Sequence, residues 1–206
     1  MKPTDISRPD YFHKVVDCQY ACPAHTPVPE YIRMIAAGKY DDAYMVNWKS
    51  NVFPGILGRT CDRPCEPACR RGRVEEGNVE LRKPTEHGEP HAEPVAICRL
   101  KRVAADNKAK DGVAKRMPKA PAKNNGKKIA CIGAGPASLT VARDLTPLGY
   151  QITVFEADPK AGGFMRTQVP RFRLPEEVID EEVGYILNIG NIDYKGGHRI
   201  ASMKAL

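Results

Sequence analysis

The sequence predicts a helical, cysteine-rich domain followed by part of a parallel α/β domain. Six of the seven cysteines lie before residue 99, among short segments with helical apolar patterns. From Lys127 an apolar run, a glycine-rich turn, a helical pattern and a second apolar run follow one another, an order typical of a parallel α/β unit. We therefore divide the chain into a helical domain at 1–107, a basic linker at 108–126 and an α/β part at 127–206.

Two helices are expected early in the helical domain. Residues 28–35 carry an apolar helical pattern with a proline in the first turn, and Gly38 is placed to end this helix. Residues 41–49 form the second, where two aspartates favour the helix N-terminus.

A third helix is expected at residues 94–106, where helical spacing places Val95, Cys98 and Arg102 on one face. The preceding residues 75–93 are rich in Glu, Gly, Pro and His and lack apolar periodicity, which predicts an exposed loop. Metal binding by the histidines of this loop is the less favoured alternative.

The α/β part begins with a strand near 127–132, continues into a helical pattern at 139–148, and reaches a second strand at 151–156. Gly133 and Gly135 lie in the turn between the first strand and the helix, where glycines let backbone amides approach a pyrophosphate at a helix N-terminus. The alternative is a glycine turn kept only for packing.

The other positions of this dinucleotide pattern are also filled. Ser138 takes the third place, where Gly or Ala is usual, and adds a hydroxyl in a tight position. Glu156 ends the second strand, where a carboxylate can accept both ribose hydroxyls and would repel a 2′-phosphate. The pattern therefore favours FAD or NAD over NADP.

The net charge of +7 is concentrated between Arg99 and Lys128, a segment that contains eleven Lys or Arg and only two aspartates. A short basic connector without interleaved aromatic residues is a weak nucleic-acid footprint, so we interpret it as a solvated linker. The first residues lack the apolar run of a secretory signal and no stretch is apolar enough to span a bilayer, so we expect a cytoplasmic protein.

Cysteine clustering in a reducing compartment favours metal binding over disulfides. Cys61, Cys65 and Cys69 follow one another at x3 spacing, and Cys18-x3-Cys22-Pro adds two more thiols. These spacings do not divide into one tetrahedral zinc site, and a proline after a ligating cysteine occurs in ferredoxin motifs, so an iron–sulfur centre is favoured over zinc.

Cys131 lies within the first strand, and we expect it to pack in the core.

Several motifs together resemble the glutamate synthase small subunit and the N-terminal module of dihydropyrimidine dehydrogenase, over almost the whole chain. The motifs that carry the resemblance are Cys-x3-Cys-Pro at 18–23, VPEYI at 28–32, GRTC at 58–61 with Cys65 and Cys69, PVAI at 94–97, GAGPA at 133–137, VFE at 154–156, AGGFM at 161–165 and VPRFRLP at 169–175. The resemblance implies two 4Fe-4S clusters that exchange electrons with FAD, while NAD(P)H binds a further domain beyond Leu206.

By position in the family motif, Cys22, Cys61 and Cys65 would share one cluster. The fourth ligand in relatives is a Gln or Glu, and that position holds Lys101 here. Cys98 lies one turn earlier on the same expected helix face, so we hypothesise that its thiolate takes that place.

The other cluster would take Cys18 and Cys69. The upstream cysteine pair expected from the family is absent, and Asp10 and His13 stand at the matching offsets. His13 is a potential imidazole ligand, as in Rieske centres. Alternatively, Cys18 and Cys69 complete a single rearranged cluster.

The resemblance also implies a set of FAD-binding residues and a role in electron transfer. Gly162 and Gly163 would let the backbone pass close to the flavin and its phosphates, with an arginine nearby for charge. The expected set is Gly133, Gly135, Pro136, Ala137, Ser138, Glu156, Gly162, Gly163, Phe164 and Arg171.

We expect a subunit or fragment of an NAD(P)H-linked oxidoreductase that works with other subunits, such as those of a glutamate synthase or of a molybdenum or tungsten formate dehydrogenase. No catalytic acid–base pair is expected, because the cofactors carry the redox chemistry. The alternative function is a zinc-stabilised docking module with a remnant nucleotide-binding fold.

Overall fold

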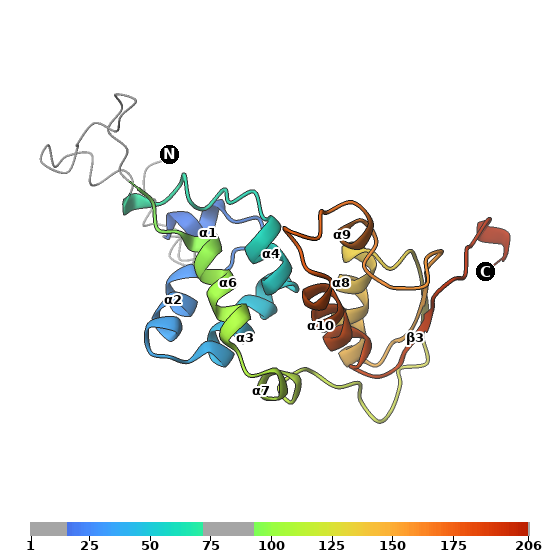
Figure 1. Cartoon of the computed structure of the whole chain (residues 1–206). Helices are drawn as coiled ribbons and strands as arrows, with labels where there is room; N and C mark the ends of the chain where they lie inside the picture. Colours follow the sequence, from blue (N-terminus) through green and yellow to red (C-terminus); the bar gives the residue numbers. More distant parts are fainter. Residues whose placement is uncertain (1–15, 72–92, 206) are drawn as a thin grey trace, which may run out of the picture. The chain divides into compact units, whose positions relative to one another are not determined.

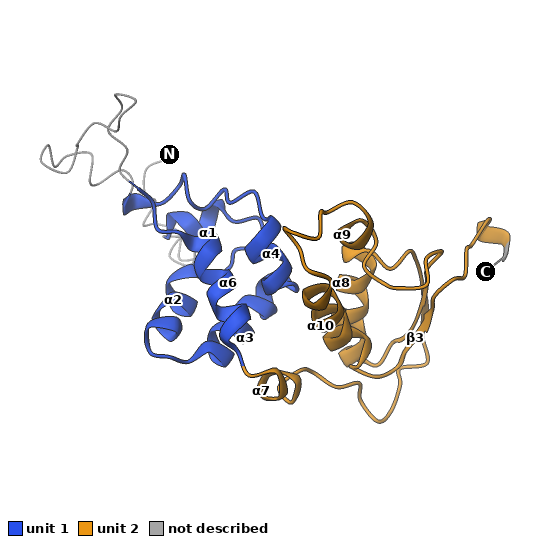
Figure 2. Cartoon of the chain, in the orientation of Figure 1, with its two compact units in different colours: residues 1–108 blue, residues 109–206 orange. Residues whose placement is uncertain are grey.

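The structure is a computed structural model that describes residues 16–71 and 93–205. The chain divides into two compact units, residues 1–108 and 109–206 (Figure 2). The expected ligand or neighbour positions Asp10 and His13, and nearly all of the predicted loop at 75–93, lie outside the described residues.

The described part of unit 1 is helical (Figure 1). Its helices are α1 (Asp17–Ala21), α2 (Val28–Ala36), α3 (Tyr40–Asn51), α4 (Pro54–Thr60) and α6 (Ile97–Asn107). The three helices predicted from periodicity correspond to α2, α3 and α6. Gly38 has a φ of +71° just beyond α2, and this left-handed conformation, which glycine adopts without strain, ends the helix as predicted.

The core of unit 1 forms where α2, α3 and α6 meet. Its buried residues are Val28, Tyr31, Ala43, Cys65, Ile97 and Ala104. Tyr31 is 0% exposed, and its hydroxyl donates a 3.0 Å hydrogen bond to the carbonyl of Ile97. Such a bond satisfies a buried phenol and fixes α2 against the start of α6.

The residues that helical spacing places on one face of α6 differ in burial. Cys98 is buried, but Arg102 is exposed and pairs with Asp106, whereas the neighbouring Lys101 is 5% exposed. The reason is the close packing of α4 on α6: a Cβ on Gly58 would lie 2.8 Å from the Arg102 amide nitrogen. The backbone of Arg102 therefore faces α4 while its side chain points to solvent.

Unit 2 contains a three-stranded parallel sheet in the order β1-β2-β3. Its elements are α7 (Lys110–Ala114), β1 (Lys128–Ile132), α8 (Pro136–Leu145), a 3-10 turn η3 (Thr146–Leu148), β2 (Gln151–Phe155), α9 (Phe164–Thr167), α10 (Glu176–Leu187), β3 (Ile192–Lys195) and a 3-10 turn η4 (Met203–Ala205). Cys131 in β1 pairs with Val154 in β2 and is 7% exposed, in keeping with its predicted core role.

The segment predicted as a basic linker contains structure of its own. The short helix α7 forms within it, with Val113 fully buried. The amide of Ala120 donates a 2.9 Å hydrogen bond to the carbonyl of Ile189, which ties the segment to the end of α10. No helix in the described ranges 16–71 and 93–205 has the length and apolar character to cross a membrane.

Candidate cofactor sites

Four thiols from separate segments of unit 1 approach one another. Cys22 lies at the C-terminal end of α1, Cys61 at the end of α4, Cys65 in the turn that follows, and Cys98 in the first turn of α6. Cys61 and Cys98 share a side-chain hydrogen bond, and the charges of Cys61 and Cys22 both act on Cys65. These interactions place Cys61 near Cys98, and Cys65 near Cys61 and Cys22, while the assignment of all four to one cluster stays a prediction.

Local backbone geometry holds these thiols in place. Arg63 adopts a φ of +62°, uncommon for a residue with a side chain, and its amide donates a 3.3 Å hydrogen bond to the Cys61 Sγ. The Glu66 carboxylate accepts a 3.0 Å hydrogen bond from the Cys98 amide at the start of α6. Since α6 has no cap from its own N-cap residue, Glu66 satisfies one of its free amides and links the cysteine turn to this helix.

The electrostatics of the group are uneven. The hydrogen bond from Cys98 lowers the pKa of Cys61 to about 5, and the same bond raises the pKa of Cys98. Burial raises the pKa of Cys65 to about 11. Lys101 favours the ionised form of all three thiols. Thiolates are the form in which cysteine binds metal.

Cys18 and Cys69 lie close enough for their charges to interact, and Cys18 also packs against the core that contains Cys65. Burial is the main cause that raises the pKa of Cys18, and the charge of Cys69 adds to it. An ion pair of 2.7 Å between Arg70 and Asp17 joins the ends of the two segments that carry these cysteines. Their proximity is compatible both with a second cluster and with a single rearranged cluster, so these alternatives stay predictions.

The donor chemistry of the four-thiol group suits an iron–sulfur cluster. All seven cysteines are free, and the soft thiolate donors select Fe–S clusters or zinc. Within the described residues, no group of three or more His, Cys, Asp or Glu side chains is arranged to hold a single metal ion. A cubane cluster is larger than one ion, so its ligands stand farther apart than those of zinc.

In unit 2 the glycine-rich turn follows β1 and leads into α8. Gly133 has a φ of +87°, and its amide donates a 2.7 Å hydrogen bond to the carbonyl of Phe155. Gly135 is the N-cap of α8, which begins with Pro136 and has no side-chain cap. The free amides of the first turn of α8, which include those of Ala137 and Ser138, are therefore available to an anion.

A second glycine pair packs against this turn. The amide of Gly162 donates a 2.9 Å hydrogen bond to the carbonyl of Ala134. Gly163 has a φ of +51°, and a Cβ there would lie 2.8 Å from the Cα of Gly135. The two backbones touch, which requires glycine at position 163.

Glu156 holds the glycine turn from the end of β2. Its Oε2 accepts a 2.6 Å hydrogen bond from the Ala134 amide, and its Oε1 accepts a 3.1 Å bond from the Asp158 amide. A carboxylate has roughly four acceptor positions, so capacity for further donors remains. Ser138 is half-buried rather than enclosed, so its hydroxyl is accommodated.

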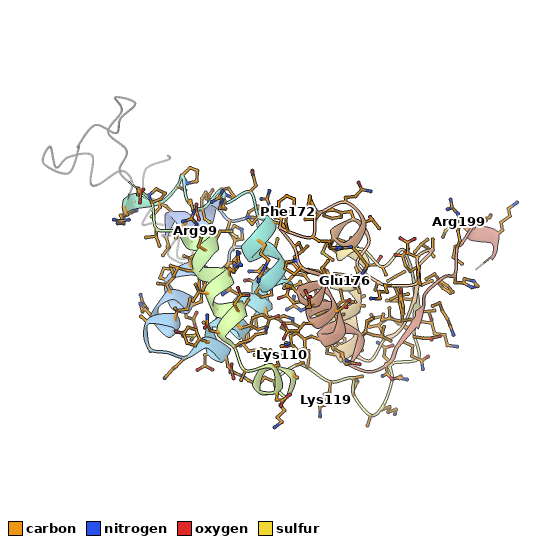
Figure 3. All side chains as sticks on the ribbon, in the orientation of Figure 1. Arg99, Lys110, Lys119, Phe172, Glu176 and Arg199 are labelled. Atoms are coloured by element: carbon orange, nitrogen blue, oxygen red, sulfur yellow. The ribbon has the colours of Figure 1, made fainter. Side chains whose placement is uncertain are left out.

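Two further residues of the expected FAD set lie at the surface. Phe164 is 56% exposed at the start of α9, and Arg171 is exposed and donates to the carbonyl of Arg166. Between Arg171 and α10, Phe172 is 92% exposed (Figure 3).

Arg166 is a structural residue that the sequence reasoning missed. Its side chain is 11% exposed and binds the Ala161 carbonyl at 2.9 Å, Glu176 at 2.7 Å and Asp180 at 2.5 Å. It thereby connects the turn at Gly162 to α10. The signal was an arginine directly after AGGFM with acidic residues ten and fourteen positions later, but the sequence alone does not bring these together.

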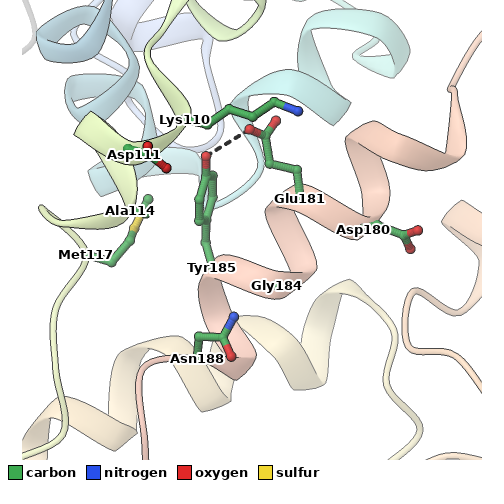
Figure 4. A pocket seen from close by; sticks show the side chains of 9 residues that line it. All are labelled: Lys110, Asp111, Ala114, Met117, Asp180, Glu181, Gly184, Tyr185 and Asn188. Carbon is green, nitrogen blue, oxygen red and sulfur yellow. Dashed lines mark hydrogen bonds between the residues drawn. The ribbon is translucent and has the colours of Figure 1, made fainter.

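Unit 2 also contains a shallow pocket between α7 and α10 (Figure 4). Tyr185 points into it and donates a 2.9 Å hydrogen bond to Glu181. Burial and the neighbouring carboxylates, including Asp111, raise the pKa of Tyr185. None of the predicted cofactor-binding residues lines this pocket.

Comparison with family models assigns both parts of the chain. Residues 12–113 match the model of dihydropyrimidine dehydrogenase domain II, a 4Fe-4S cluster domain. Residues 131–191 match the NAD(P)-binding Rossmann-like domain. The chain belongs to the iron–sulfur oxidoreductase family of the glutamate synthase small subunit and the dihydropyrimidine dehydrogenase N-terminal module. The resemblance and the fold class stated from the sequence are confirmed, and nothing supports the zinc alternative.

Three relatives illustrate the family. The beta subunit of the NADP(+)-dependent formate dehydrogenase of Moorella thermoacetica is 35% identical, over 84% of this chain and 25% of its own length. A homologue of the NAD-dependent dihydropyrimidine dehydrogenase subunit PreT from Salmonella typhi is 33% identical, over 91% of this chain and 42% of its own length. The glutamate synthase [NADPH] small chain of Mycobacterium tuberculosis is 30% identical, over 84% of this chain and 32% of its own length. The chain therefore spans less than half the length of these relatives.

Proposed function

We propose that this chain is an electron-transfer subunit or fragment of an NAD(P)H-linked iron–sulfur flavoprotein. It binds a 4Fe-4S cluster through Cys22, Cys61, Cys65 and Cys98, and FAD at the glycine turn of unit 2. The observation that supports the proposal is that thiols from separate segments, Cys61 with Cys98 and Cys65 with Cys61 and Cys22, influence one another within a region that matches a 4Fe-4S domain. When bound, these cofactors supply the redox chemistry, and the protein supplies their binding, position and electrostatics.

In unit 1 the protein's contribution is to present thiolates in a partly buried setting. The Arg63 amide already donates to Cys61, and hydrogen bonds of this kind to ligand sulfur influence cluster potentials. Cys18 and Cys69 support a proposal for a second cluster, which would need ligands beyond these two.

In unit 2 the free amides at the start of α8 suit a pyrophosphate, and Glu156 retains acceptor capacity for ribose hydroxyls. FAD is favoured over a nicotinamide cofactor at this turn because the family motifs at 161–165 and 169–175 follow it. As in the relatives that are named as subunits, we expect other oxidoreductase subunits as partners, and a cytoplasmic location.

The test is the content of iron, acid-labile sulfide, zinc and flavin per chain after anaerobic purification. About eight iron and eight sulfide indicate two clusters, and about four indicate one. Zinc without iron or flavin would overturn the proposal and favour the docking module.

Variants of two buried cysteines locate the ligands. We expect Cys98→Ala to lose iron, while the matched control Cys131→Ala, in β1 of the other unit, keeps the wild-type content. Full iron content in Cys98→Ala would show that the fourth ligand is another residue.

A further inference from the structure

Lys101 is a buried cation in unit 1. It is 5% exposed and lies on α6 three residues after Cys98, on the face that packs into unit 1. Burial of a charge costs several kcal/mol unless an opposite charge compensates it. A buried lysine therefore requires an explanation.

No carboxylate provides that compensation among the described residues. The ion pairs of residues 16–71 and 93–205 include none with Lys101. The groups on which its charge acts are the thiols of Cys61, Cys65 and Cys98. The sulfurs that we assign to the cluster would therefore supply its counter-charge once they bind metal as thiolates.

We propose that the positive charge of Lys101 raises the reduction potential of the cluster held by Cys22, Cys61, Cys65 and Cys98. This inference rests on the proposed function. A cluster with four thiolate ligands is an anion, and reduction adds one more negative charge. A fixed ammonium nearby stabilises the reduced form more than the oxidised form, because Coulomb energy grows with the charge it faces.

Removal of the ammonium leaves the reduced cluster with less stabilisation, so the midpoint potential falls. Arg99 offers a matched comparison, because it lies on the same helix but is exposed (Figure 3). Water and salt screen its charge, so its removal should change the potential much less.

The experiment compares the full chain as wild type, Lys101→Met, Lys101→Gln, Lys101→Arg and Arg99→Met. Iron and sulfide are measured first, and the cluster is then titrated anaerobically with dithionite as electron donor while its electron paramagnetic resonance signal is followed. We expect both neutral Lys101 variants to lower the equilibrium constant for reduction at least tenfold, which is about 59 mV for one electron. Lys101→Arg and Arg99→Met should stay much closer to wild type.

Each outcome decides one question. A neutral variant with full iron content and the wild-type potential overturns the inference, while the proposed function stands. Loss of iron in both neutral variants, with native circular dichroism and retention in Lys101→Arg, supports the requirement for charge; loss of iron in Lys101→Arg as well overturns it. Wild-type protein without iron refutes the proposed function itself.

Discussion

Replacement of Gly163 by alanine is expected to destabilise unit 2 by about 2–6 kcal/mol. The φ of +51° strains any residue with a Cβ, which costs about 1–3 kcal/mol. The new Cβ would also lie 2.8 Å from the Gly135 Cα and 3.3 Å from its amide nitrogen. Both are backbone atoms that cannot rotate away, and such overpacking costs a further 1–3 kcal/mol or so.

The assay is thermal unfolding followed by circular dichroism. In a unit of this size each kcal/mol shifts the Tm by about 4–8 °C, so even the smallest expected cost lowers the Tm by about 8 °C. A Tm within about 2 °C of wild type would refute the reasoning, because it would mean that the two glycine turns are not in contact.

Gly135→Ala is the matched control from the other side of the same contact. A Cβ on Gly135 meets nothing within 4 Å, and its φ of −79° suits any residue. Alanine at the N-cap costs a little stability, whereas the lower conformational entropy of the unfolded chain adds a similar amount. The two effects nearly cancel, so the Tm should barely change. Flavin content should nevertheless fall, because the added methyl group would occupy the space that a pyrophosphate needs.

Three further substitutions test contacts that position the sites, each by urea denaturation. Arg166→Met should cost about 1–3 kcal/mol of unfolding free energy because one carbonyl and two carboxylates lose a shared donor, and Arg166→Lys should recover only part of it. Glu66→Ala should cost about 1 kcal/mol by leaving the Cys98 amide without its acceptor, with a Glu66→Gln variant closer to wild type. Tyr31→Phe should cost about 1–2 kcal/mol because the Ile97 carbonyl loses its buried phenol donor; an unchanged midpoint would mean that water replaces it.

Periodicity predicted the regular elements it was applied to, since α2, α3, α6, β1 and β2 all follow the apolar patterns of their sequences. Helix α10 was not predicted, although its buried Ile179, Val183 and Ile186 have helical spacing. Spacing alone did not show which face of α6 is buried, and Arg102 is exposed although it shares a face with Cys98. Neighbouring helical positions point about 100° apart, and the packing of Gly58 on this helix selects which of them is covered.

For the cofactor sites, the sequence predicted candidate residues but not the contacts between distant segments that position them. Spacing singled out the candidate ligand cysteines, but which thiols lie close together depends on how α1, α4 and α6 pack, which local sequence does not encode. The contact of Gly163 with Gly135 and the connections made by Arg166 and Glu66 join segments far apart in the chain, and no periodicity reports such contacts.

The peptide group that precedes Ala134 and the one that follows it are both already held before any ligand arrives. Glu156 accepts from its amide, the Gly162 amide donates to its carbonyl, and Ala134 itself is fully buried. A ligand that binds here therefore has little backbone to order, and it loses little affinity to conformational entropy. The site is preorganised, so the association rate of a ligand at this turn should be limited by diffusional encounter and not by loop rearrangement.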